Sequence, residues 1–370
     1  MYQHGISIQQ KRLMDLFRDM VNIYSPSGKE EDLTTFLWEY IASKGLAIKK
    51  QPVDESRCNL LISSGRATPD TLFLGHIDTI AAPDIENFEY NERGGVCFGL
   101  GSADMKGGCA ALIEAFLTAA MGNFLPDNVM LALVVGEEEN GDGTSVLLDE
   151  YSFKRALVAE PTDLTPCLDH YGYIEMNLRT FGERRHAALS DHQFNAIRAM
   201  LRFLLNLEEY VESSKPHAAL NIRDLHSSES GFAVPDSCAV SIDFHIPPDY
   251  STRSYMDSLL PFIESRMNQS DASRHELEFP TLSNGFRVGE DESLSVQLKD
   301  IYNGSGLKWN PGAFKSHSDA NLLFECDCKP IILGPGQLAK AHTIDESVTA
   351  AQVIDAAEIF TRLLFHQSSS

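Results

Sequence analysis

Apolar runs in this chain are repeatedly followed, within a few residues, by a side chain that can bind a metal ion. The runs are Thr71–Leu74, Val129–Val135, Ala156–Ala159 and Pro330–Leu333, and the side chains after them are His76, Glu138, Glu160 and His342. A further carboxylate, Asp104, lies in the glycine-rich segment GSADMKGG. In an open α/β sheet, ligands bind outside the carboxyl ends of the strands. If these side chains converge there, their nitrogen and oxygen atoms suit zinc or a similar divalent ion.

The hydrophobic periodicity up to about residue 160 alternates between strand-like and helix-like segments. Helices are expected over Gln9–Tyr24, from Ser27 through Lys44, and from Gly107 onward. Strands are expected at Ile48–Val53, Asn59–Ser63, Thr71–Gly75, 129–135 and 156–159, with a hairpin formed by Phe88–Asn91 and Val96–Gly99. This alternation predicts an α/β fold with a mostly parallel mixed sheet flanked by helices.

The pattern changes after about residue 172. Strands are expected at Ile174–Phe181, Ala219–Leu225, Cys238–Ile246 and His275–Phe279, and helices at Gln193–Tyr210 and Tyr255–Asn268. This βαββαβ order predicts a small antiparallel sheet with helices on one face. The α/β pattern returns from Leu294 and ends with a helix over Ala350–Leu364. We therefore expect an α+β domain over 173–284, inserted between the two parts of a first domain, 1–172 and 285–370.

Length and charge limit the classes of protein to consider. A chain of 370 residues is long enough for two domains. The net charge of −23 argues against a nucleic-acid partner and against binding to an anionic membrane surface. No apolar run approaches the roughly 20 residues of a membrane span, and the N-terminal sequence lacks the pattern of a secretory signal. Seven dispersed cysteines favour reduced thiols, so a cytoplasmic protein is expected.

The residues near these candidate ligands also suit a metal site. Asp78 follows His76 closely and could fix the tautomer of the imidazole. Glycines on both sides of Asp104 would let the backbone approach a metal. The acidic run Glu137–Glu139 repels itself unless a cation or a proton lies within it. In a site with two metal ions, Asp104 could bridge them and Glu137 could be the general base. Each of these residues taken alone also fits an ordinary turn or solvated loop.

Several motifs appear in a fixed order along the chain. They are GHID at 75–78, GLGSADMKGG at 99–108, GEEENGDG at 136–143, AEPT at 159–162, SDAN at 318–321, and GPG with HT at 334–343. From about Leu13 to Leu364 the chain resembles the M20 family of metallopeptidases and deacylases. The resemblance implies a zinc-exopeptidase-like fold that carries an inserted lid and dimerisation domain.

The resemblance also implies a site for two zinc ions, with cobalt and manganese as alternatives. One ion would be bound by His76, Asp104 and Glu160, and the other by Asp104, Glu138 and His342. Asp78 would support His76, the peptide bond between Asp104 and Met105 would be cis, and Glu137 would be the general base.

The register of the acidic run is open to a second interpretation. Aligned on Gly141, the base and the ligand would become Glu138 and Glu139. We place them at Glu137 and Glu138 because Gly136 then stands at the position of the family's usual Asp, and Gly143 keeps its usual offset.

In this family the inserted domain pairs two subunits and places a histidine in the partner's active site. His186 in FGERRHAAL fits that pattern, so the resemblance implies a homodimer in which His186 donates a hydrogen bond to the tetrahedral oxyanion. The alternative is a surface histidine beside Arg184 and Arg185.

The chain departs from its relatives near the acid end of the substrate. Phe232 in FAVPD takes the place of an asparagine, and His245 in DFH takes the place of an arginine. An imidazole does not reproduce a bidentate guanidinium contact. The acid end would therefore be bound more weakly, by His245, or by another group such as His317, Lys315 or Arg185.

Three functions are compatible with these residues. The leading prediction is hydrolysis of the amide bond of a small N-acyl amino acid, of the acetylornithine or acetyl-lysine type found in arginine or lysine biosynthesis. Lys315 and Asn321 fit that branch of the family, but SDAN and HTIDE also fit its carboxypeptidase and tripeptidase branches, and Lys315 also fits an ordinary solvated loop. The second is an exopeptidase, a carboxypeptidase or a di- or tripeptidase, acting on short peptides. The third is a non-catalytic binding protein on the same fold.

Overall fold

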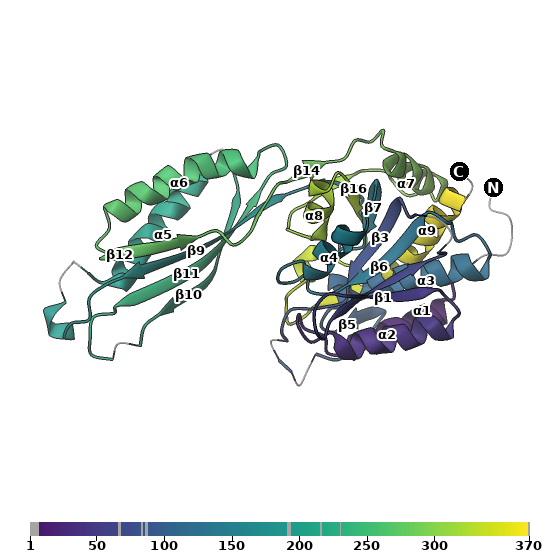
Figure 1. The fold of residues 1–370 in the computed structure, drawn as a ribbon, viewed down its shortest axis with the longest axis horizontal. Helices are drawn as coiled ribbons and strands as arrows, with labels where there is room; N and C mark the ends of the chain where they lie inside the picture. Colours follow the sequence, from purple (N-terminus) through teal and green to yellow (C-terminus); the bar gives the residue numbers. More distant parts are fainter. Residues whose placement is uncertain are drawn as a thin grey trace. The chain divides into compact units, whose positions relative to one another are not determined.

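The chain divides into two compact units (Figure 1). The computed structural model describes residues 7–65, 68–82, 84–85, 88–190, 194–214, 217–229 and 231–368. Unit 1 comprises Met1–Leu168, Val288–Phe314 and Ser318–Ser370, and unit 2 comprises Asp169–Arg287 and Lys315–His317. The sequence placed the boundaries after residues 172 and 284, and the roles expected for the two domains stay predictions.

A nine-stranded sheet lies mainly in unit 1, in the order β1-β2-β6-β3-β7-β16-β8-β14, with β15 paired to β8. Its last strand, β14, falls within the residues of unit 2. Its strands are β1 (Ile48–Pro52), β2 (Cys58–Ser63), β3 (Thr71–His76), β6 (Val129–Val134), β7 (Arg155–Val158), β8 (Cys167–His170), β14 (Phe286–Arg287), β15 (Gly312–Phe314) and β16 (Lys329–Ile332). Strands β6, β3, β7 and β16 are parallel. The pairs β1–β2, β2–β6 and β16–β8 are antiparallel. The sheet is therefore mixed, with parallel pairs at its centre.

Helices cover this sheet because their apolar faces need burial. They are α1 (Gln10–Val21), α2 (Glu31–Ser43), α3 (Gly107–Met121), α4 (Asp142–Glu150), α7 (Ser293–Gly304), α8 (Asp319–Glu325) and α9 (Ala350–Ser368). Helix α3 packs on β3 between α1 and α9, and Phe116 meets Phe73 edge-on at a centroid distance of 5.4 Å. Gly108 lets the start of α3 approach β7, since a Cβ there would lie 2.3 Å from the carbonyl oxygen of Ala159.

A small three-stranded sheet, β17-β5-β4, adds to unit 1. Its strands are β4 (Asn91–Arg93), β5 (Val96–Phe98) and β17 (Ser347–Thr349). The hairpin predicted near residue 94 exists, but its first strand is 91–93 and not 88–91. The chain reverses at Gly94 and Gly95, whose φ values of 61° and 79° suit glycine. That turn sets the pairing of Arg93 with Val96.

Unit 2 is built on a five-stranded antiparallel sheet in the order β10-β11-β9-β12, with β13 paired to β9. Its elements are β9 (Gly172–Phe181), α5 (Ala196–Ser213), β10 (Ala219–Ser227), β11 (Ser237–Ile246), α6 (Thr252–Asn268), β12 (Arg274–Glu278) and β13 (Leu282–Ser283). Both helices bury their apolar faces in one core with β9 and β11. The predicted βαββαβ order is confirmed.

The sequence missed some elements and misassigned one helix start. It assigned no helix to the segments that form α4 and α8. It also made Ser27 the start of the second helix, whereas α2 begins at Glu31 and its N-cap, Glu30, makes no side-chain cap. The Ser27 hydroxyl donates instead to the Asp78 carboxylate at 2.7 Å. A serine before a helix can therefore serve a distant partner.

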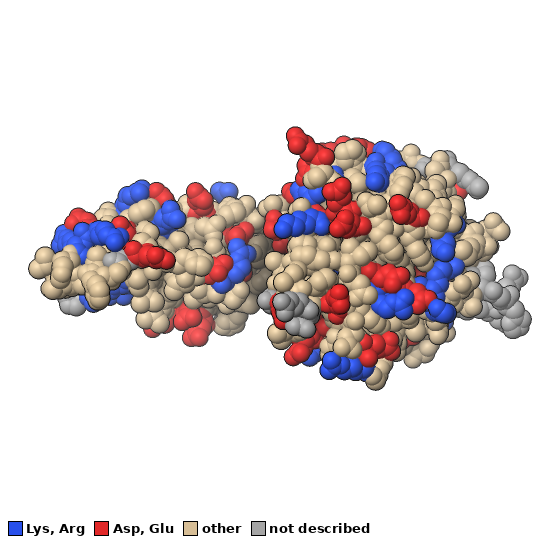
Figure 2. Space-filling view, turned by 90° about the horizontal axis from the view of Figure 1, so that it is seen from below, with Lys and Arg blue, Asp and Glu red and all other residues tan. Residues whose placement is uncertain are grey.

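Two surface properties bear on the environment of the protein. None of the helices in the described ranges is long and apolar enough to cross a membrane. On the face that Figure 2 shows, Lys and Arg side chains lie scattered among Asp and Glu. The net charge of −23 is therefore not gathered into a single patch on that face.

Candidate metal centre

The carboxyl ends of the central parallel strands are aligned. The register pairs His76 with Val134, and Leu74 and Ile332 both pair with Val158. The segments that leave β3, β6 and β7 therefore begin at one edge of the sheet. His76, Glu137, Glu138 and Glu160 follow from these strand ends, which is why segments distant in sequence meet there.

His76 is the last residue of β3 and is 1% exposed. Its Nδ1 donates a hydrogen bond to the carbonyl oxygen of Asp78 at 3.0 Å. In the neutral ring this leaves the Nε2 lone pair free, and Nε2 lies 3.2 Å from Asp104 Oδ1 and 3.8 Å from Glu160 Oε1. A histidine oriented in this way is prepared to bind a cation.

Asp104 lies in a tight turn just before α3, and its peptide bond to Met105 is cis, as expected. Glu346 holds this turn: its carboxylate accepts the N–H groups of Gly101, Ala103 and Asp104 at 2.9, 2.9 and 3.0 Å. Glu346 is only 3% exposed. One buried carboxylate thus fixes the backbone that carries Asp104.

The second histidine approaches Asp104 from the other side. His342 Nε2 lies 2.9 Å from Glu138 Oε2 and 3.5 Å from Asp104 Oδ2. Two donor groups result, His76 with Asp104 and Glu160, and Asp104 with Glu138 and His342. Within each group the ligand atoms lie within 4.8 Å of one another. Asp104 belongs to both groups, one oxygen facing each histidine.

The charges in this cluster are balanced poorly by protein groups alone. Burial raises the pKa of Glu137 and of Glu160 well above the usual range. Burial acts to lower the pKa of His342, but its hydrogen bond to Glu138 and the nearby carboxylates outweigh this and raise it to about 9. The carboxylates therefore tend to bind a proton, and His342 tends to be positively charged. A divalent cation could replace these protons, because carboxylate oxygens and imidazole nitrogens are its usual ligands.

Glu137 lies beside the donor groups. Its Oε2 is 3.9 Å from His76 Nε2, and its side chain is 11% exposed. Asp78 holds this turn, since its carboxylate accepts the N–H groups of Glu137 and Glu138 at 3.2 and 3.1 Å. Its Oδ1 lies 3.6 Å from His76 Nδ1. Glu139, the alternative in the acidic run, is exposed.

A further carboxylate near Glu137 had no role assigned from the sequence. Asp319, the first residue of α8, is 1% exposed. Burial raises its pKa to about 7, and its charge contributes to the raised pKa of Glu137. Its only signal in the sequence was the SDAN motif, just as the only signal for Glu346 was its place four residues after His342.

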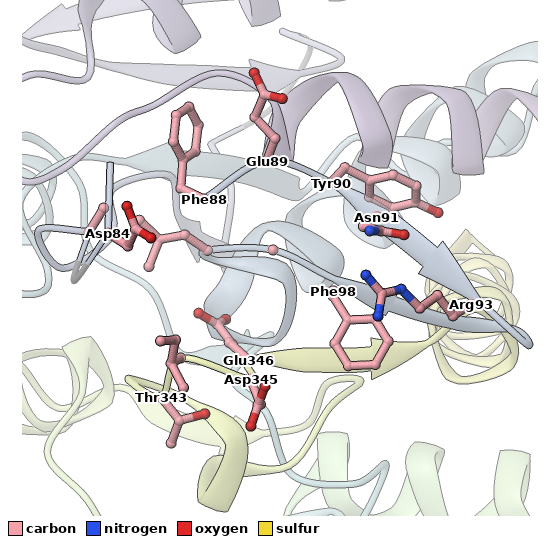
Figure 3. Close-up of a pocket in the computed structure, with 14 residues that line it drawn as sticks. Asp84, Phe88, Glu89, Tyr90, Asn91, Arg93, Phe98, Thr343, Asp345 and Glu346 are labelled. Atoms are coloured by element: carbon pink, nitrogen blue, oxygen red, sulfur yellow. The ribbon is translucent and has the colours of Figure 1, made fainter. Parts of the chain in front are cut away.

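A pocket of about 520 Å³ lies in unit 1 beside the segment that carries His342 (Figure 3). Arg93 and Phe98 line it from the β4–β5 hairpin, and Thr343, Asp345 and Glu346 line it from the segment before β17. Its walls combine aromatic rings with acidic groups. Glu346 therefore borders this pocket while its carboxylate holds the Asp104 turn.

His186 lies in unit 2 on an exposed segment. Its Nδ1 accepts the N–H of Ala188 at 3.2 Å, so the proton of the neutral ring lies on Nε2. The same segment pairs with the one that carries Phe232, since the Ala187 N–H donates to the Phe232 carbonyl at 2.9 Å. Phe232 is 92% exposed. An imidazole N–H and an aromatic ring are thus presented on paired segments.

His245 and His317 flank one aromatic ring in unit 2. The Tyr173 ring lies 5.4 Å from the His245 ring and 5.1 Å from the His317 ring, between centroids. His245 Nδ1 is buried without a hydrogen-bond partner in the described part of the chain. Burial lowers the pKa of His317 to about 4, so that ring is neutral near pH 7. Lys315, nearby in sequence, is exposed.

Two candidate metal-binding groups that share a carboxylate, next to the largely buried Glu137, are the arrangement expected of a metal-dependent hydrolase. Comparison with known proteins identifies the family. The model of peptidase family M20/M25/M40 matches residues 72–366, and the chain belongs to this family. It is therefore a metal-dependent amidohydrolase.

Individual relatives are similar over nearly their whole length. A probable succinyl-diaminopimelate desuccinylase of Staphylococcus aureus is 22% identical, over 96% of this chain and 97% of the relative. A tripeptidase structure from Staphylococcus aureus has a TM-score of 0.83 at 19% identity, and covers 99% of this chain and 100% of that one. Human carnosine dipeptidase 1 has a TM-score of 0.77 at 12% identity, covering 98% and 97%. At these identities the structural matches establish the fold alone.

Proposed function

We propose that this protein uses two zinc ions to hydrolyse the amide bond of a small N-acyl amino acid, of the acetylornithine or acetyl-lysine type. The observation that carries the proposal is the pair of donor groups that share Asp104, next to Glu137, whose side chain is only 11% exposed. The relative named as a desuccinylase supports cleavage of an acyl group from an amino acid.

Each residue of the two groups has a distinct place. His76 and Glu160 would bind one ion, Glu138 and His342 the other, and Asp104 both. Bound there, the two ions would supply Lewis acidity for the scissile carbonyl and would lower the pKa of the attacking water. Cobalt or manganese would suit the same nitrogen and oxygen donors.

Glu137 would be the general base. Its carboxylate would take a proton from the attacking water and deliver it to the nitrogen of the leaving amine. Burial that raises the pKa of Glu137 suits it to hold that proton between the two steps. Asp78 would keep both glutamates in place through their backbone N–H groups.

His186 would act in a homodimer. We propose that the Nε2–H of His186 from one subunit donates a hydrogen bond to the oxyanion in the other subunit's site. Its tautomer supports this role, since Nδ1 already accepts a backbone N–H. A donor of this kind contributes about 3 kcal/mol to transition-state stabilisation.

An exopeptidase that acts on short peptides is the second candidate. The similarity to solved structures named as a tripeptidase and a dipeptidase favours it. One assay separates the two activities: zinc-loaded protein is offered N-acetyl amino acids and dipeptides, and the products are measured. Release of acetate supports the deacylase. If the protein releases amino acids from dipeptides but no acetate from N-acetyl amino acids, the exopeptidase is the correct assignment.

The assignment of the base is tested by Glu137→Gln. The variant should retain both zinc ions, since no proposed ligand is lost, and kcat should fall by about 10²- to 10⁴-fold. Zinc content and turnover are measured on the same preparation. Full activity would transfer the role of base to Glu138. His342→Ala and Glu160→Ala should instead lower the zinc content.

The acid end of the substrate would be bound by His245, His317 or Lys315. In the zinc-loaded Glu137→Gln protein, binding of a free-acid ligand is compared with binding of its carboxamide. Neutral imidazoles predict similar affinities for the two, because they offer no charged contact. A strong preference for the acid that survives His245→Ala would show that another residue, such as Lys315, binds it.

A further inference from the structure

Arg57 is the residue just before β2, and its side chain lies against the turn that carries Glu137 and Glu138. Its Nη2 donates to Asp142 Oδ2 at 2.7 Å, at the end of that turn. Its Nη1 packs against the start of the turn, where a Cβ on Gly136 would lie 2.8 Å away. One guanidinium therefore touches both ends of the segment.

The guanidinium itself is held firmly. Its Nε donates to Asp54 Oδ2 at 2.6 Å, and Nη1 lies 3.8 Å from Glu30 Oε1. The Arg57 side chain is 15% exposed and that of Glu30 is fully buried. A planar fork that contacts several carboxylates has a fixed orientation, unlike an exposed and flexible cation.

The backbone hydrogen bonds within the turn close it but do not attach it to the rest of unit 1, so the turn needs support from other side chains. The N–H groups of Asn140 and Gly141 donate to the Gly136 carbonyl at 3.2 and 2.8 Å. Gly136 has a φ of 76°, and the space beside it is taken by Arg57. Asp78 holds the other side of the turn through the backbone N–H groups of the two glutamates.

We infer that Arg57 is a positioning residue, which through Gly136 and Asp142 holds Glu137 and Glu138 in their places at the metal centre. The part that concerns Glu137 rests on the proposed function. The part that concerns Glu138 does not, since metal binding is measurable without turnover. A misplacement of about 1 Å in such a group can cost about 10²-fold in rate.

The test is Arg57→Met in the full chain, with zinc affinity measured by competition with a chromophoric chelator. Zinc should bind at least tenfold more weakly. At zinc saturation kcat should fall tenfold or more, while KM changes less than about threefold, since substrate contacts are retained. Arg57→Lys keeps the charge but cannot contact both ends, so its losses should be intermediate.

Arg12→Met is the matched control. The side chain of Arg12, in α1, is also only 13% exposed, and its guanidinium is paired with Glu114 in α3. Its loss should lower stability without changing zinc affinity or kcat. Wild-type zinc affinity and kcat in folded Arg57→Met protein would overturn the inference, and so would equal losses in Arg12→Met.

If Arg57→Met does not fold, Asp142→Asn tests the same inference. It removes the ion pair at the end of the turn and should weaken zinc binding in the same direction. In a double-mutant cycle, the losses from Arg57→Lys and Asp142→Asn should be less than additive. Unchanged zinc affinity in Asp142→Asn would overturn the inference. Absence of turnover in the wild-type protein would refute the proposed function alone, since the zinc measurements would still decide the role of Arg57.

Discussion

At the scale of the residue, burial decides what each ionisable side chain can do. Burial raises the pKa of the Glu137 and Glu160 carboxyls in the candidate metal centre, whereas, against the effect of burial, the hydrogen bond to His76 helps to keep the pKa of Asp104 below its usual value. Burial has the opposite effect on a histidine elsewhere. His170 is fully buried, stacks on Phe286 and donates to the Tyr171 carbonyl at 2.8 Å, and burial lowers its pKa to about 3. It therefore stays neutral in the folded protein.

His170 should make the protein sensitive to acid. In the unfolded chain its pKa is about 6.5, so below that pH the unfolded state binds more protons than the folded state. Stability from this residue is present above pH 6.5 and is lost as pH falls toward 3. Between pH 7 and pH 5 the loss should be about 2 kcal/mol. Urea unfolding at both pH values should show a smaller pH dependence in His170→Phe, and an unchanged one would contradict the assignment.

At the scale of the element, two ion pairs of helix α1 differ in how far their side chains are exposed to water. Helices α1 and α3 are joined by Arg12 and Glu114, with contacts of 2.7 and 2.8 Å between guanidinium and carboxylate. Glu114 is 1% exposed and also accepts the Gln9 N–H at 2.6 Å. On the outer surface of α1, Lys11 and Asp15 form a pair at 2.6 Å, but their side chains are 89% and 38% exposed.

The buried pair should therefore matter far more than the exposed one. Glu114→Gln leaves the Arg12 charge without a counter-ion and should lower the free energy of unfolding by about 3 kcal/mol. Asp15→Asn should lower it by less than about 1 kcal/mol, because water screens that pair. Urea unfolding of both variants gives the comparison. Equal losses would mean that α1 and α3 are held by apolar packing alone.

At the scale of the whole molecule, the candidate metal centre joins segments of unit 1 that are far apart in the chain. His76, Asp104, Glu138, Glu160 and His342 come from separate connections around one sheet edge. A cation bound there would stabilise the folded state, because the unfolded chain does not hold these groups together.

Removal of metal should lower the melting temperature. Zinc at 100 times its Kd should add about 2.7 kcal/mol per site, which corresponds to roughly 5 °C or more for a domain of this size. Thermal melts with zinc and with excess chelator measure the difference. Glu160→Ala should lose part of the shift, and a wild-type protein that melts equally with and without zinc would contradict the site.

Local pattern was enough to predict the central elements and the candidate ligands. Apolar runs indicated β3, β6, β7 and β16, because strand burial depends on side chains within a few residues of one another. Carboxylates and imidazoles just after those runs indicated a metal site, since parallel strands present their carboxyl ends at one edge. The hairpin itself was predicted, but its first strand was placed at 88–91 and not at 91–93, because the tight turn at the two adjacent glycines with positive φ pairs Arg93 with Val96.

Only the tertiary structure decided which distant groups support the ligands. The sequence did not indicate that Glu346 would hold the Asp104 turn, that Ser27 would bind Asp78, or that Arg57 would lie under Gly136. Such contacts join residues that no local periodicity connects, and they depend on how helices and loops pack around the sheet. The sequence by itself therefore determined the chemistry available at the sheet edge, and packing determined the geometry in which that chemistry is held.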